Sequence, residues 1–303
     1  MINTYCQNLI PKLDEIELQI KNFGVQLKPI LILEGKTDFC IYDKMLTHSK
    51  VNRSKYDIAV AGGKKNINNF FKSKIIENVD YVALLDSDHD FYYGKQIQDD
   101  YVIYTHFYDM ENYLTIIEVI ESTYDDFKGI TSKSMDSKKF ITALTDLAYP
   151  SLIASEYKKR YLKKYGFDSN IFSMDIIKVK DTRLNCEKKL DERIYSVKEI
   201  IINESKKGNF KFDSELWDKT LYYLSEKLDK LEDIKLDEYI QMQLKGRRII
   251  DIYREIFNAI FPQLMKDRTK VVFTNDLRKN FMASKQAKDL LQKIDVKLEK
   301  LLA

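Results

Sequence analysis

Two apolar runs, each followed directly by a carboxylate residue, constrain the fold of this chain more than any other sequence feature. Ile30–Leu33 is followed directly by Glu34, and Val82–Leu85 is followed by Asp86, with Asp88 two residues further on. Continuous β-prone runs of this kind are typical of central strands buried in a parallel sheet. The carboxyl ends of parallel strands meet at one edge, so the three acids are expected to lie together there. They have no evident basic partner, and a divalent cation would relieve their repulsion, so the pattern predicts a metal site.

The stretch from residue 29 to residue 128 alternates apolar strands with amphipathic helices. Such alternation predicts an α/β fold with a parallel, doubly wound (Rossmann-like) sheet flanked by helices. The expected strands are 30–34, 56–61, 80–86 and 101–105, and the expected helices are about 37–47, about 66–77 and one that starts near 110.

A Ser- and Lys-rich stretch, residues 129–139, is expected to end the α/β region. Beyond it, apolar residues recur at spacings of three and four, which predicts a mostly α-helical C-terminal region. The stripes run through Leu190, Ile194, Val197 and Ile201, through Leu221, Leu224, Leu228 and Leu231, and through Ile249, Tyr253, Ile256 and Ile260. We therefore expect an N-terminal helix in 1–28, an α/β domain in 29–128 and a helical region in 140–303, which ends in a basic amphipathic helix over about 284–302.

Composition narrows the class of protein. The chain has 303 residues, 44% hydrophobic and 32% charged, with a net charge of +3, so charge alone neither demands nor excludes nucleic acid. Cys6, Cys40 and Cys186 are widely separated, which indicates neither a zinc ribbon nor a disulfide framework and fits a reducing cytoplasm. No apolar stretch approaches the length of a membrane span, and the N-terminus has no signal-peptide core, so no membrane association is expected.

Further acids are expected near the predicted metal site. Asp38 falls in the first turn of the helix expected over 37–47, where the helix dipole favours any acid. Asp109 and Glu111 begin the next helix, where an N-cap and a first-turn acid are ordinary. That helix start lies at the same sheet edge as Asp86, so Glu111 is also a candidate ligand of the metal or of its water, and Asp109 is considered for the same role.

Gly62, Gly63 and Lys64 follow the second expected strand and precede a helix. They do not form a P-loop, because Ile58 stands where the upstream glycine is required and Lys65 where Ser or Thr is required. The glycines can still bring backbone N–H groups, together with Lys64, to a phosphate at a helix N-terminus. A tight turn with surface lysines is the alternative interpretation.

The helical region carries basic residues interleaved with tyrosines, as surfaces that bind nucleic acid do. The candidates are Lys158, Lys159, Arg160, Lys163 and Lys164, which lie between and around Tyr157 and Tyr161. An ordinary solvated helix face explains the same pattern. We expect this region to determine target and partner, and the α/β region to supply the chemistry.

The segments Glu34-Gly35, Asp38 and Asp86-Ser87-Asp88 together resemble the motifs of the Toprim domain, the metal-binding catalytic module of topoisomerases, primases and many nucleases. The resemblance covers residues 29–125. It implies a Toprim-like sheet in which Asp86 and Asp88 anchor one or two Mg²⁺ ions, with Mn²⁺ able to substitute. It further implies that Glu34 is a ligand or the general base, and that Asp38 is a second-metal ligand or an outer-shell group.

In Toprim nucleases of the old-type class, which are paired with ABC-like ATPases, a basic residue from outside the core often acts at the scissile phosphate. Lys245 and Arg247, from the cluster Lys-Gly-Arg-Arg, are the candidates here, and a helix-flanking charge cluster is the alternative. The chain lacks the length of a topoisomerase gate and the zinc-binding cysteines of a primase. With these two classes excluded, the resemblance implies a small Toprim nuclease with a helical appendage.

The overall order of the motifs is similar to that of the AriB-like family, the Toprim-like effector nucleases of the PARIS anti-phage system. The resemblance implies an ABC-type ATPase partner (AriA-like) that restrains the nuclease, and release as a homodimer. It also implies cleavage of an RNA such as tRNA. Three alternatives stay open: a non-catalytic Toprim-like module that docks to an ATPase, a DNA-directed old-type nuclease, and a phosphatase-like or nucleotidyl-transferring enzyme.

Overall fold

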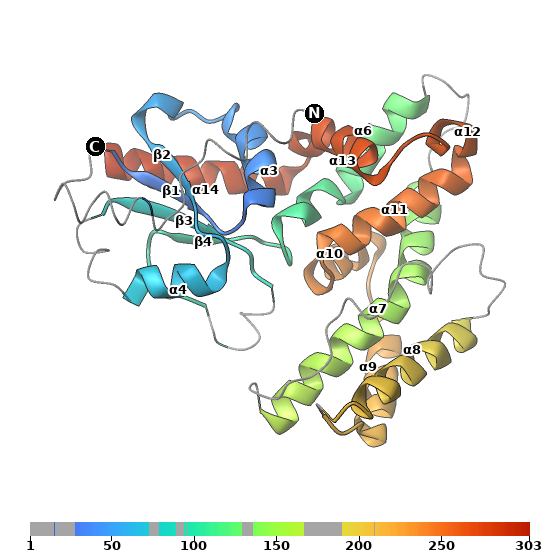
Figure 1. The fold of residues 1–303 in the computed structure, drawn as a ribbon. Helices are drawn as coiled ribbons and strands as arrows, with labels where there is room; N and C mark the ends of the chain where they lie inside the picture. Colours follow the sequence, from blue (N-terminus) through green and yellow to red (C-terminus); the bar gives the residue numbers. More distant parts are fainter. Residues whose placement is uncertain are drawn as a thin grey trace. The chain divides into compact units, whose positions relative to one another are not determined.

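Four parallel strands form a sheet in the described part of the chain, in the order β2-β1-β3-β4 (Figure 1). The computed structural model describes residues 15, 28–72, 79–88, 94, 96–128, 136–166, 190–208 and 210–303, so the predicted N-terminal helix lies outside it apart from Glu15 and Lys28. The strands are β1 (Ile30–Leu33), β2 (Asp57–Val60), β3 (Tyr81–Leu85) and β4 (Val102–Tyr104). The predicted parallel α/β sheet is confirmed.

The two central strands are buried along their whole length, which explains their unbroken apolar sequence. Every residue of β1 and β3 is buried, and Ile30 pairs in register with both Asp57 and Tyr81. A fully buried Leu or Ile side chain contributes about 1.5–3 kcal/mol, so these two strands form the stable centre of the sheet. Their shared register makes them end side by side.

Helices cover the sheet. Alternate residues of the strands pack with Ile67 and Phe70 of α4 (Lys64–Lys72). Helix α3 (Lys36–Leu46) packs on β1, and α14 (Lys285–Leu302) packs on β3 and on α3. Figure 1 shows α4 on one side of the sheet and α3 with α14 on the other.

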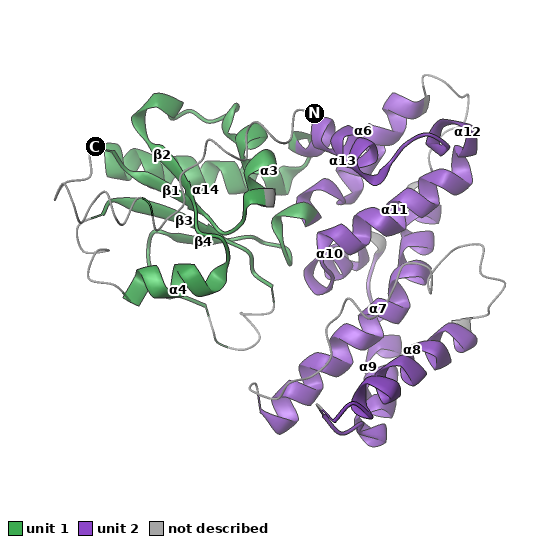
Figure 2. Ribbon diagram, in the orientation of Figure 1, with its two compact units in different colours: residues 1–111, 282–303 green, residues 112–281 purple. Residues whose placement is uncertain are grey.

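Helix α14 belongs with the sheet, although the sequence analysis grouped it with the helical region. The chain divides into two compact units, unit 1 with residues 1–111 and 282–303 and unit 2 with residues 112–281 (Figure 2). Within unit 1, Asp295 of α14 accepts hydrogen bonds from Ser49 Oγ at 2.5 Å and Lys50 N at 3.0 Å. The apolar stripe of α14, which includes Leu290, Ile294 and Leu298, is buried.

Unit 2 is helical in its described residues, as predicted. Its longest helix, α7, contains Pro150 and packs against α8, α9, α10 and α11. None of the described helices is both long enough and apolar enough to cross a membrane. The helices are α6 (Ile117–Lys128), α7 (Ser137–Tyr165), α8 (Leu190–Ser205), α9 (Ser214–Asp229), α10 (Asp233–Gln243), α11 (Gly246–Ile260), α12 (Pro262–Met265) and α13 (Lys270–Asn280).

The helix expected from residue 110 begins instead as a 3₁₀ turn, Met110–Leu114, and the α-helix α6 starts only at Ile117. Short 3₁₀ turns also occupy Arg53–Lys55 and Phe281–Ala283.

The buried carboxyl group of Asp237, in α10, is hydrogen-bonded to the start of α6. Asp237 accepts hydrogen bonds from Ile117 N and Gln241 Nε2, each at 3.2 Å. Gln241 Nε2 also donates to Thr115 O at 2.7 Å, and Gln241 Oε1 accepts from Asn112 Nδ2 at 3.0 Å. Burial raises the pKa of Asp237 to about 7, because the two hydrogen bonds offset only part of the lost hydration.

We expect unit 2 to lose stability as the pH rises from about 4 to about 7. The unfolded chain releases the Asp237 proton near pH 4, whereas the folded chain retains it until about pH 7, so rising pH favours unfolding within this window. The change in unfolding free energy should be on the order of 2–4 kcal/mol. Urea unfolding at pH 5 and pH 8 measures it.

In Asp237→Asn, most of this pH dependence should disappear. Asp218→Asn, at an exposed position of α9, is the matched control and should keep it. Equal pH dependence in the wild type and Asp237→Asn would show that Asp237 does not titrate in this window.

Candidate metal centre at the carboxyl edge of the sheet

Glu34 and Asp86 lie next to each other where the two central strands end. Glu34 follows β1 and Asp86 follows β3, and the Asp86 backbone N–H donates to Glu34 Oε2 at 3.2 Å. This contact places the Glu34 carboxylate against the backbone of Asp86. The adjacency predicted from the two apolar runs is therefore present, and the role of the two acids in metal binding stays a prediction.

Asp86 is the electrostatic centre of the edge. Burial raises its pKa well above the ordinary value, and the neighbouring carboxylates of Asp38, Asp109, Glu34 and Asp88 raise it further. Asp86 Oδ1 accepts a hydrogen bond from Met110 N at 3.0 Å, which fixes the orientation of the carboxyl group. The repulsion from four neighbouring acids favours a positive charge near Asp86.

Asp38 and Asp109 are both buried, with exposed fractions of 5% and 8%. Asp38 lies in the first turn of α3, as predicted, and its Oδ2 accepts from Gly35 N at 2.8 Å. Asp109 comes just before the Met110–Leu114 turn. The predicted ligand Glu111 is half-buried within that turn, whereas Asp109 is the acid of this segment that acts on Asp86. Sequence spacing alone did not show which of these two acids acts on Asp86.

Asp88 has an unusual backbone conformation and an unexpected partner. Its φ is +44°, in the left-handed region that non-glycine residues rarely adopt. The expectation that the acids have no basic partner is wrong. Lys64 Nζ donates to Asp88 Oδ2 at 2.7 Å and to Asp86 O at 3.1 Å.

The turn before α4 explains why Lys64 reaches the acids. Gly62 and Gly63 have φ values of +77° and +119°, which a β-carbon would strain. Gly63 N donates to Glu34 O at 2.9 Å, so the turn is attached to the end of β1. Lys64, the first residue of α4, therefore begins at the same edge as the carboxylates. The predicted phosphate-binding group Gly62, Gly63 and Lys64 thus adjoins the predicted metal ligands.

The donor chemistry of this edge fits Mg²⁺, although the side chains do not enclose an ion as they stand. Among the described residues, no three Asp, Glu, His or Cys side chains are grouped so that they could hold a metal. Oxygen donors alone select hard cations, and Mg²⁺ is usually bound by one or two carboxylates while it keeps several waters. Glu34 and Asp86 are the adjacent pair available for this.

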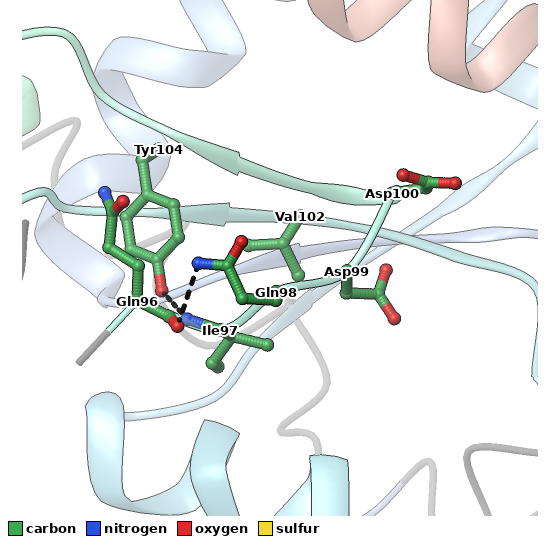
Figure 3. Close-up of a pocket in the computed structure, with 7 residues that line it drawn as sticks. All are labelled: Gln96, Ile97, Gln98, Asp99, Asp100, Val102 and Tyr104. Carbon is green, nitrogen blue, oxygen red and sulfur yellow. Dashed lines mark hydrogen bonds between the residues drawn. The ribbon is translucent and has the colours of Figure 1, made fainter. Parts of the chain in front are cut away.

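A hollow in unit 1 lies elsewhere, beside the edge strand β4. It has a volume of about 560 Å³ and is lined by Gln96, Ile97, Gln98, Asp99, Asp100, Val102 and Tyr104 (Figure 3). Tyr104 OH accepts from Ile97 N at 2.8 Å, and Asp99 Oδ2 accepts from Tyr81 OH at 2.7 Å. None of the acids around Asp86 lines it.

Most of the basic residues predicted to bind nucleic acid are engaged within unit 2. Lys159 Nζ lies 2.6 Å from Glu156 Oε2, and burial lowers the pKa of Lys159. Arg160 donates to Glu156 Oε1 at 2.8 Å, and its guanidinium lies 4.1 Å from the centre of the Tyr223 ring. These contacts tie α7 to itself and to α9.

The remaining basic candidates differ in their surroundings. Lys164 pairs with Asp213, the N-cap of α9, at 2.7 Å, Lys163 is exposed and Lys158 is half-buried. In unit 2, Lys245 and Arg247 are exposed at the start of α11. The roles predicted for these residues stay predictions.

Asp86→Asn is expected to make the metal-free protein more stable. The amide keeps the Oδ1 that accepts from Met110 N and removes a buried charge repelled by its neighbours. The unfolding free energy in the presence of EDTA should rise by about 1 kcal/mol or more, as is common when a strained functional residue is neutralised. Thermal and urea denaturation in EDTA measure this gain.

Asp57→Asn, at an exposed position of β2, is the control and should change stability by less than about 0.5 kcal/mol. If Asp86→Asn is instead less stable than the wild type without metal, the negative charge of Asp86 is not a source of strain.

Comparison of the chain with models of known protein families gives no match, and comparison with curated proteins gives none either. The geometry of the acidic edge is therefore the main evidence on function.

Proposed function

We propose that this protein is a Mg²⁺-dependent Toprim-like nuclease that hydrolyses phosphodiester bonds of nucleic acid. The observation that carries the proposal is the convergence of acids on Asp86 at the carboxyl edge of a parallel sheet, with Glu34 in contact with the Asp86 backbone. In open α/β sheets this edge is where ligands bind. A partly buried cluster of like charges is destabilising unless it binds something positive, and this supports a functional role.

The residues have distinct roles in this proposal. Asp86 and Asp88 hold the ion together with Glu34, which is either a ligand or the general base. Asp38 and Asp109 add negative charge around Asp86 and increase its attraction for a cation. Bound Mg²⁺ supplies charge neutralisation at the phosphate and activation of a water. Lys64, at the N-terminus of α4, is placed next to the acids and offsets charge on the phosphate.

The biological role that we propose follows from the resemblance of the motifs to AriB-like nucleases. The protein is then the toxic effector of an anti-phage defence system, held in check by an ABC-type ATPase (AriA-like). It acts as a homodimer when released, and its substrate is an RNA such as tRNA. Unit 2 supplies the surface for substrate and partner, and unit 1 supplies the chemistry. A DNA-directed old-type nuclease would use the same acids.

A specific observation favours a second candidate, a non-catalytic Toprim-like module. The ammonium group of Lys64 already pairs with Asp88 at 2.7 Å, so one acid of the predicted set has a counter-charge without metal. In a non-catalytic module this pair would be permanent, and the fold would serve to dock an ATPase. The two candidates differ in whether Glu34 is needed for any chemistry.

Glu34→Gln should abolish Mg²⁺-dependent nuclease activity and leave the fold intact. The substitution keeps the size of the side chain and removes the charge, so cleavage of RNA should fall about 100-fold or more. Purified full-length protein is incubated with tRNA or with DNA, with Mg²⁺ and with EDTA, and the products are resolved on gels. Circular dichroism and thermal unfolding check the fold.

Glu299→Gln, on the exposed face of α14, is the matched control and should cleave like the wild type. Activity on RNA alone, on DNA alone or on both identifies the substrate class. Full activity of Glu34→Gln would refute the catalytic assignment, and EDTA-resistant cleavage would refute the metal dependence.

A further inference from the structure

The ammonium group of Lys64 sits against the carboxylates that are proposed to bind metal. Its Nζ lies 2.7 Å from Asp88 Oδ2 and 3.1 Å from Asp86 O. The side chains of Lys64 and Asp88 are 24% and 36% exposed, so water screens the pair only in part. Lys64 thus supplies one positive charge among five carboxylates.

The backbone of Asp88 is strained in this arrangement. Its φ of +44° lies in the left-handed region, which residues with a β-carbon rarely adopt. Asp88 N donates to Tyr108 O at 2.7 Å, and Ser87 N donates to Thr105 Oγ1 at 2.9 Å, so neighbouring backbone contacts hold the strained turn. Asp88 is directed to Lys64 in this turn, and the acids do not form a three-ligand group.

We propose that Lys64 is an internal counter-cation which divalent metal must displace from Asp88. The inference rests on the proposed function, since it concerns the same site. In the metal-free protein the ammonium group offsets part of the repulsion around Asp86. When the ion binds, Asp88 exchanges Lys64 for the metal, and the ammonium group leaves for solvent or for a substrate phosphate. Until substrate is bound, Lys64 thus acts on the metal site only through its ion pair with Asp88.

The proposal predicts more than a structural ion pair would. A purely structural pair persists whether or not metal is present, and the accessibility of Lys64 then stays constant. A displaced counter-cation becomes more accessible when metal binds. Removal of its charge should also strengthen metal binding, because the metal no longer competes with it.

Amine labelling of the full-length protein tests the exchange. The protein is treated briefly with an acylating reagent, with and without Mn²⁺, and labelling of each lysine is quantified by mass spectrometry. Lys64 labelling should rise about twofold to fivefold with Mn²⁺, the range for loss of a partly exposed ion pair. Lys65, the exposed neighbour on α4, is the internal control and should not change.

Mn²⁺ titration by calorimetry supplies the second readout. Lys64→Met should bind Mn²⁺ about threefold to tenfold more tightly than the wild type, and Lys65→Met should differ from it by less than about twofold. If the protein binds Mn²⁺ but labelling of Lys64 stays constant or falls, the exchange is refuted and the metal site is retained. The same holds if Lys64→Met binds Mn²⁺ with unchanged affinity. Absence of Mn²⁺ binding by the wild type would overturn both.

Discussion

The repulsion among carboxylates around Asp86 is the interaction on which the account of this protein depends. The fold imposes it: β1 and β3 share a register, so their terminal acids end up side by side. Burial then removes the water that would screen the charges, and the pKa of Asp86 rises. A chain selected for stability alone would not keep such a cluster, and the proposed cation would relieve the repulsion within it.

The surrounding structure holds this strained edge in place. The apolar centre of the sheet and the helices on its two faces supply the stability that the acids reduce. The backbone N–H groups of Gly35 and Met110 orient the carboxylates of Asp38 and Asp86. Lys64 provides a local counter-charge, made possible by two glycines with positive φ. Each of these contacts lies within unit 1.

The sequence was sufficient for the parts of the fold that depend on hydrophobic periodicity. The strands 30–33 and 81–85 and the C-terminal helices followed from apolar patterns that persist over many residues. Features that depend on a tertiary contact were not predictable. Asp88 pairs with Lys64, which lies more than twenty residues away in sequence, and its N–H donates to Tyr108 O within the turn that has positive φ. Likewise, nothing in the amphipathic pattern of α14 indicates that it packs on β3. The sequence around Asp237 does not distinguish this buried acid from an ordinary acid of a helix surface.

Direct observation of a bound ion tests the central claim most simply. Crystals of the full-length protein soaked with Mn²⁺ would be measured at the manganese absorption edge, with crystals of Asp86→Asn as the control. The account predicts an anomalous peak within about 2.5 Å of carboxylate oxygens of Glu34 or Asp86, lost or weakened in the variant. Manganese bound only elsewhere, or an unchanged peak in Asp86→Asn, would contradict the assignment of this edge as the metal centre.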